Sequence, residues 1–210
     1  EVRLTILHTG QHDELAQSML DLFGIVPDVN LKVMKQGQDL FSLSADLLPR
    51  LSTVLQDQEP DFVIVQGDTT TSYLTALSSF YLKIPVLHVE AGLRTGNLYA
   101  PFPEEMNRRQ ISQIADFHFA PTELNKRNLI AEGISPSKIS VTGNTVIDAL
   151  KIIQRSNEYE QSEPNILSKF TQNERVALLT AHRRENHGTP LKHILEAVQE
   201  LLDADNDLVV

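Results

Sequence analysis

The chain has 210 residues, 41% of them hydrophobic and 22% charged, which is ordinary for a globular protein of one large domain or one and a half. Its net charge of -10 disfavours a nucleic-acid-binding protein, and the lack of cysteine excludes disulfides, thiolate nucleophiles and cysteine-ligated metals. Because no apolar stretch approaches about 18 residues and no basic-then-apolar leader opens the chain, we expect a cytoplasmic protein without a membrane partner.

Short apolar runs rich in valine and isoleucine alternate with helical patterns along the chain. The runs predict strands over residues 2–7, 62–66, 86–89, 117–120, 139–142, 176–180 and 208–210. The intervening patterns predict helices over residues 13–23, 40–56, 70–82, 103–115, 122–132, 145–154 and 190–202. This alternation is typical of βα units, so the predicted fold class is α/β with a parallel sheet.

Ionisable residues stand just past the ends of separate predicted strands. Asp68 follows the run at 62–66, and Glu90 directly follows the run at 86–89. His182 follows the run at 176–180 in the same way. Ligands of parallel α/β sheets bind outside the carboxyl ends of the strands, so these residues predict an enzyme-like site.

Each of these acids also has a structural interpretation. Asp68 could cap the helix that begins beside it, because Asp accepts hydrogen bonds from the first turn. Glu90 could form an ion pair with Arg94, although a glutamate at a strand end beside glycine more often contacts a ligand. At the start of the helix at 103–115, two pairs have the i,i+4 spacing of surface ion pairs: Glu104 with Arg108, and Glu105 with Arg109.

The segment 181–186 (AHRREN) offers an imidazole and two guanidinium groups after a strand. Arginine suits bidentate recognition of phosphate, and a solvated basic turn is the alternative. The histidines show no metal-site spacing, so no metal is expected. No Gly-x-Gly-x-x-Gly fingerprint for a nicotinamide is present either, and we expect no cofactor.

Several segments taken together are specific to one family. They are Gly-Gln-His at 10–12, GDTTTS at 67–72, HVEAGLRTG at 88–96, PFPEEMNRR at 101–109, TGNTVIDAL at 142–150 and AHRREN at 181–186. In this order they resemble the bacterial UDP-N-acetylglucosamine 2-epimerase family, and the non-hydrolysing members most nearly. The resemblance implies two Rossmann-like domains in a glycosyltransferase-B-type arrangement, with a UDP-sugar substrate in the cleft and a homodimeric assembly.

The resemblance also implies roles for individual residues. The positions that match the family's catalytic groups are Asp68, Glu90, Glu104 and His182. Arg183, with Arg94 and Asn144, is expected to contact the substrate. Gln11, His12 and Gln38 match positions that hold a second, activating UDP-N-acetylglucosamine in some members.

Three domain segments are expected. Residues 1–142 form an N-terminal Rossmann-like domain that lacks the family's first strand and loop, residues 143–174 a connecting helix and linker, and residues 175–210 the start of a C-terminal Rossmann-like domain. Because both ends interrupt strand–helix units, we expect a fragment of a longer protein that is inactive alone.

The implied reaction interconverts UDP-N-acetylglucosamine and UDP-N-acetylmannosamine by elimination and re-addition of UDP. One acid must take the C2 proton and another must return one, which is why several carboxylates are needed around one sugar. Two alternatives remain: a hydrolysing epimerase that releases N-acetylmannosamine, and an inactive nucleotide-sugar-binding fragment. A retaining glycosyltransferase of similar fold would not require this cluster of acids.

Overall fold

The computed structural model describes residues 2–10, 13–35, 37–155, 175–181 and 188–210, and divides into two compact units, Glu1–Ala149 and Leu150–Val210. The elements of the first unit, in chain order, are β1 (Leu7–His8), α1 (Asp13–Leu22), β2 (Val29–Asn30), α2 (Leu40–Gln58), β3 (Val63–Gln66), α3 (Thr70–Tyr81), β4 (Val86–Val89), α4 (Glu104–Ile114), β5 (Phe117–Ala120), α5 (Glu123–Ala131), the 3₁₀ turn η1 (Pro136–Lys138) and β6 (Ile139–Val141). α6 (Thr145–Arg155) begins in this unit and ends in the second.

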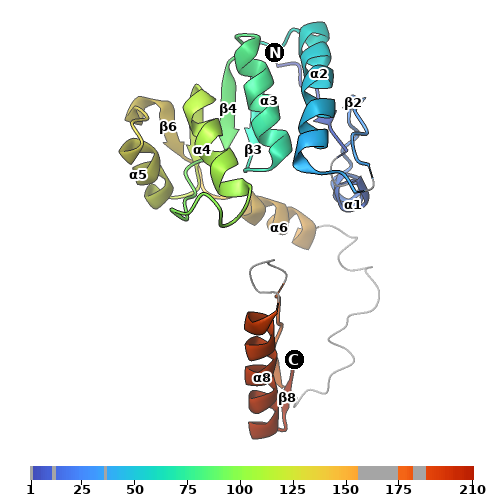
Figure 1. The fold of residues 1–210 in the computed structure, drawn as a ribbon, viewed down its shortest axis with the longest axis vertical. Helices are drawn as coiled ribbons and strands as arrows, with labels where there is room; N and C mark the ends of the chain where they lie inside the picture. The colour runs from blue at the N-terminus through green and yellow to red at the C-terminus, as the bar shows by residue number, and fades with distance from the viewer. Residues whose placement is uncertain (1, 11–12, 36, 156–174, 182–187) are drawn as a thin grey trace. The chain divides into compact units, whose positions relative to one another are not determined.

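The first unit is built on parallel sheets, as the alternation of runs predicts. β3, β4, β5 and β6 lie side by side in sequence order, and every neighbouring pair is parallel (Figure 1). β1 and β2 form a separate parallel pair. The α/β fold class is therefore confirmed.

Three apolar clusters hold the helices on these strands. α2 buries Leu43, Leu47 and Leu51, which recur along one helical face and pack with Val33 and Leu74. α3 and α4 cover β3 and β4 through a second cluster: Val65, Ala76, Val86, Ile111 and Ala115 (Figure 1). A third cluster joins α5 to β5 and β6: Ala91, Ala120, Leu129 and Ile139.

The first strand differs most from expectation. The sequence predicts a strand over 2–7, whereas β1 contains only Leu7 and His8 and pairs with the two residues of β2, which the sequence did not predict. Val2 and Leu4 are exposed to 84% and 71%. A strand exists only where a partner strand supplies hydrogen bonds, and β2 offers a partner for two residues.

The second unit contains β7 (Arg175–Val176), α8 (Thr189–Ala204) and β8 (Leu208–Val209). β7 and β8 are parallel, and the Arg175 guanidinium contacts the Asp205 carboxylate at 2.6 Å. Pro190 lies in the first turn of α8, as its sequence position predicts. Across the described residues, every helix is too short or too polar to span a bilayer.

Candidate active site

The turn after β3 carries Asp68 to the carboxyl end of the sheet. β3 and β4 are in register with Gln66 opposite Val89, and the Gly67 amide continues the pairing with a 3.0 Å hydrogen bond to the Val89 carbonyl. Gly67 has a φ of +71°, which glycine adopts without steric cost. Asp68 and Glu90 therefore leave adjacent parallel strands at the same rim, as predicted.

The residue that caps α3 is Thr69, not Asp68. The Thr69 hydroxyl accepts a hydrogen bond from the Ser72 amide at 3.2 Å, so the interpretation of Asp68 as a helix cap is wrong. The Asp68 carboxylate instead forms an ion pair with Arg108 of α4, with 2.8 Å between Oδ2 and Nη2. Asp68 therefore lies at the rim, where its carboxylate is held by Arg108.

The surroundings of Asp68 disfavour its ionised form. Burial is the largest influence and raises the pKa of Asp68, whereas Arg108 lowers it. The nearby charges of Glu90 and Glu104 raise the pKa again, and the net result lies above the ordinary value of 3.8. Glu90 and Glu104 are therefore close enough to Asp68 for their charges to act on its carboxylate.

Glu90 lies in a strained backbone conformation where the chain leaves β4. Its φ is +66°, a left-handed value that costs a residue with a Cβ about 1–3 kcal/mol. The next residue, Ala91, donates its amide to the Phe119 carbonyl at 3.0 Å, and Gly92 lies so near Asn125 that a Cβ would clash with the Asn125 carbonyl oxygen. This bond and this close approach fix the backbone that follows Glu90, and such strain is concentrated at functional sites.

The Arg94 side chain makes its hydrogen bonds inside the protein. Its guanidinium contacts both carboxylate oxygens of Glu132, at 2.7 and 2.6 Å, and donates to the Ser112 hydroxyl at 2.9 Å. The alternative of a Glu90–Arg94 ion pair is therefore wrong. The assignment of Arg94 as a substrate ligand stays a prediction, which these internal hydrogen bonds do not favour.

α4 contacts both the loop that contains Thr95 and Gly96 and the turn that carries Asp68, and Glu105 makes the contacts with the loop. This side chain is fully buried and accepts hydrogen bonds from the backbone amides of Thr95 (3.0 Å) and Gly96 (3.3 Å) and from Arg109 Nε (3.0 Å). The predicted Glu105–Arg109 pair is confirmed, but its carboxylate lies in the interior and not on the surface. The Arg108 guanidinium forms ion pairs with Asp68 and, at 3.6 Å, with Glu105. The Glu104–Arg108 ion pair predicted from spacing is therefore wrong.

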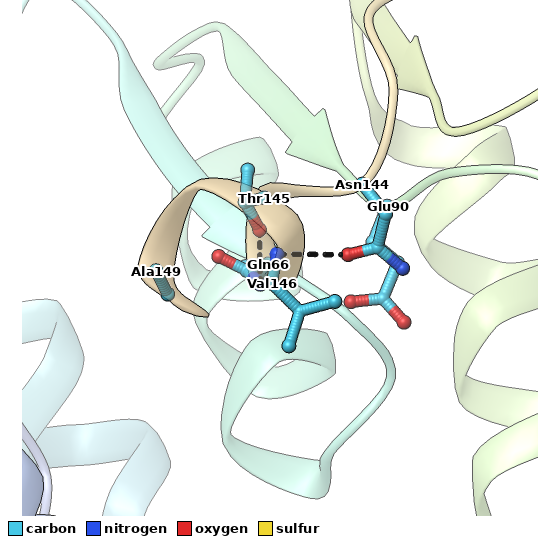
Figure 2. Close-up of a pocket in the computed structure, with 6 residues that line it drawn as sticks. All are labelled: Gln66, Glu90, Asn144, Thr145, Val146 and Ala149. Atoms are coloured by element: carbon cyan, nitrogen blue, oxygen red, sulfur yellow. Dashed lines mark hydrogen bonds between the residues drawn. The ribbon is translucent and has the colours of Figure 1, made fainter. Parts of the chain in front are cut away.

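Glu90 also lines an open pocket of about 630 Å³ at this rim, together with Asn144 (Figure 2). Two hydrogen bonds order the far wall: Gln66 Nε2 donates to the Thr145 hydroxyl at 3.2 Å, and the Val146 amide donates to Asn144 Oδ1 at 3.1 Å. Asn144 Oδ1 accepts this bond at the start of α6, and its NH₂ group can donate to a ligand.

Comparison with known proteins places this chain in a family. A family model described as UDP-N-acetylglucosamine 2-epimerase matches residues 1–210. The chain belongs to the UDP-N-acetylglucosamine 2-epimerase family. The UDP-N-acetylglucosamine 2-epimerase of Neisseria meningitidis is 48% identical over 200 residues, which cover 92% of this chain and 53% of that protein.

Solved structures of the family share the fold. The crystal structure of the Neisseria meningitidis epimerase bound to UDP-GlcNAc matches with a TM-score of 0.88 and 44% identity, over 97% of this chain and 56% of that chain. The Methanocaldococcus jannaschii epimerase in complex with UDP-GlcNAc and UDP matches with a TM-score of 0.80 and 34% identity, over 97% and 56%. The chain spans about half the length of the relatives it matches.

Other predicted site residues of this epimerase-family chain are not placed by the structure. Gln11, His12, His182 and Arg183 lie outside the described residues. Gln38 stands just before Asp39, the N-cap of α2, and within the described part of the chain its buried Nε2 has no hydrogen-bond partner. The second, activating site therefore stays a prediction.

Two residues that hold the Asp68 turn of this epimerase-family chain were not predicted from the sequence. His88 and Asn107 are buried and hydrogen-bond to the turn that carries Asp68. A histidine inside the apolar run at 86–89 was a usable signal, because a polar side chain in a buried strand needs a partner. Asn107 gave no local signal, since its partner lies 39 residues away.

The raised pKa of Asp68 predicts a pH-dependent effect on stability. A folded-state pKa above 3.8 means that the folded protein holds this proton more tightly than the unfolded chain does. The stability of the wild type relative to Asp68→Asn should therefore fall as the pH rises from 3.8 through the folded-state pKa, and then stay constant. Urea unfolding of both proteins over this range measures the difference, and a difference that does not vary with pH would contradict the prediction.

Proposed function

We propose that this chain is part of an epimerase that interconverts UDP-N-acetylglucosamine and UDP-N-acetylmannosamine. The proposal is carried by one observation: Asp68 lies within the electrostatic reach of Glu90 and Glu104 at the rim where parallel α/β sheets bind ligands. Family membership supports the same substrate, because the solved relatives named above contain UDP-GlcNAc or UDP.

The proposed reaction removes the C2 proton of the sugar and returns a proton to the opposite face. In the first step the C2–H and C1–O bonds break and a C1–C2 double bond forms. The proton passes to a carboxylate, and the C1–O electron pair leaves with UDP. In the second step a UDP oxygen adds to C1 and an acid protonates C2. Positive charge that develops at C1 as UDP leaves is stabilised by neighbouring carboxylates.

The chain supplies groups suited to each requirement. We assign proton transfer and charge stabilisation at the sugar to Asp68, Glu90 and Glu104. Burial raises the pKa of Asp68, which makes its carboxylate a stronger base and suits it to take the C2 proton. His182 is assigned to catalysis by family resemblance, and Arg183 to the UDP phosphates.

Isotope exchange in the full-length protein tests this function. UDP-N-acetylglucosamine is incubated with the protein in deuterated water, and the sugars are followed by NMR. Deuterium is expected at C2 of both epimers, because the C2 proton is lost on each elimination. Interconversion without deuterium would rule out elimination and indicate a redox route.

The same spectra separate the competing outcomes. Accumulation of free N-acetylmannosamine with UDP would identify a hydrolysing epimerase, and unchanged substrate would identify a protein without turnover. We propose the non-hydrolysing outcome, a homodimeric full-length enzyme in the cytoplasm, and no activity from residues 1–210 alone.

A further inference from the structure

Buried side chains hold three consecutive backbone carbonyls of the Asp68 turn. Each side chain comes from a different element: α3, β4 and α4. The hydrogen bonds are Ser72 Oγ to the Gln66 carbonyl at 2.7 Å, His88 Nε2 to the Gly67 carbonyl at 2.8 Å, and Asn107 Nδ2 to the Asp68 carbonyl at 2.9 Å. Ser72, His88 and Asn107, here called the carbonyl clamp, are exposed to only 8%, 0% and 2%.

The protonation of His88 follows from its surroundings. Burial is the largest influence and lowers the pKa of His88 to about 4, so the ring is neutral near pH 7. A carbonyl oxygen only accepts hydrogen bonds, so the Gly67 carbonyl requires the single ring proton to be on Nε2. His88 is therefore a fixed neutral donor and not an acid or base of the reaction.

The turn would be loose without these bonds. Gly67 lacks a Cβ and has a positive φ, so its own sterics restrict the flanking peptides weakly. Fixing the carbonyls of residues 66, 67 and 68 fixes the peptide planes on both sides of Asp68, and hence the direction of its side chain. A misplacement of about 1 Å in a catalytic group can lower a rate by about 10²-fold.

We propose that His88 and Asn107 are positioning residues that hold the Asp68 carboxylate against the sugar. The proposal rests on the epimerase function proposed above. Both side chains are almost inaccessible to solvent, so they act through the backbone of the turn to which they hydrogen-bond. The expected signature is a loss of kcat with KM for the UDP-sugar unchanged, because only the geometry of the reacting carboxylate is altered.

His118 provides a matched control for His88. It lies directly opposite His88 on β5, is equally inaccessible to solvent, and packs edge to face with it at 6.5 Å between ring centroids. Burial, the largest influence, lowers its pKa to about 4 as well. Both ring nitrogens of His118 lack a hydrogen-bond partner among the described residues, so it shares the burial of His88 but not the contact with the turn.

Two substitutions at position 88 separate hydrogen bonding from packing. In His88→Gln the side-chain amide nitrogen can reach the place of Nε2, whereas in His88→Asn it reaches only the place of Nδ1. We expect His88→Asn to lower kcat of the full-length protein by about 10- to 100-fold. His88→Gln should restore most of the activity, and His118→Asn should stay near wild type. Equal losses in His88→Asn and His88→Gln would overturn the proposal.

Asn107→Ala extends the test to α4, where alanine favours the helix. It should lower kcat in the same way as His88→Asn, again with KM unchanged. If His88→Asn does not fold, Asn107→Ala alone tests whether the clamp positions the Asp68 carboxylate. Wild-type kcat in Asn107→Ala would show that the clamp is structural only.

Hydrogen exchange separates this proposal from the proposed function. The Gly67 amide bonds to the Val89 carbonyl, so its exchange reports the order of the turn. Mass spectrometry of peptides covering residues 66–72 should show faster exchange in His88→Asn and Asn107→Ala but not in His118→Asn. If the wild type does not epimerise the sugar, the proposed function has failed, and this exchange result alone decides whether the clamp orders the turn. Unchanged exchange in both variants would refute the clamp.

Discussion

Replacing Asp68 by asparagine is expected to lower kcat of the full-length epimerase by roughly 10²-fold or more. Asparagine preserves the size of the side chain but can neither take nor return the C2 proton. Its neutral amide also cannot stabilise positive charge at C1. Steady-state kinetics of UDP-N-acetylglucosamine epimerisation measure the effect, and Glu90→Gln should behave similarly because Glu90 shares the rim.

Asp61→Asn is the matched control for Asp68→Asn. Asp61 stands just before β3, at the amino end of the strand whose carboxyl end leads to Asp68, and it is exposed. The same chemical change at the opposite end of one strand should leave kcat unaltered. If the two variants had equal activity, Asp68 would have no part in the reaction.

Glu105→Gln is expected to lower the free energy of unfolding by about 3 kcal/mol at neutral pH. Burial pushes the pKa of Glu105 upward, but hydrogen bonds from the Thr95 and Gly96 amides and from Arg109, together with the charge of Arg108, outweigh it, so the pKa lies below 4.5. Glutamine removes the negative charge and leaves both arginines without this partner. Urea unfolding of the full-length protein, followed by circular dichroism, measures the loss.

The pH dependence of this loss has a defined sign. Because folding lowers the pKa of Glu105, its stabilising effect is present above 4.5 and is lost as the pH falls through the folded-state pKa. The difference in free energy of unfolding between wild type and Glu105→Gln should therefore become smaller in acid. Glu104→Gln is the neighbouring control: it should lower kcat and leave stability nearly unchanged. Equal stability of the two variants at neutral pH would contradict the network described for Glu105.

Local patterns in the sequence were sufficient for most of the elements. β4 and β5 have the predicted bounds, α3 is one residue shorter at its carboxyl end, and α5 is one residue shorter at each end. Thr122 caps α5 as its position indicates. These elements are set by periodicity and start signals that lie within the element itself. β1 and β2 were poorly predicted because each pairs with the other over only two residues, which is too short for a periodic pattern to mark.

The shared rim of Asp68 and Glu90 was predictable from the sequence, because residues that follow neighbouring parallel strands emerge at the same edge of the sheet. The pairing of charges was not predictable, because it depends on how the helices pack. Arg94 binds Glu132, 38 residues away, and not the nearby Glu90. Arg108 binds Asp68, although spacing along the helix favoured Glu104. The carbonyl clamp was also not predictable from the sequence. Hydrogen bonds between a side chain and a remote backbone group form only after packing brings β4 and α4 against the turn, and no local spacing encodes that contact.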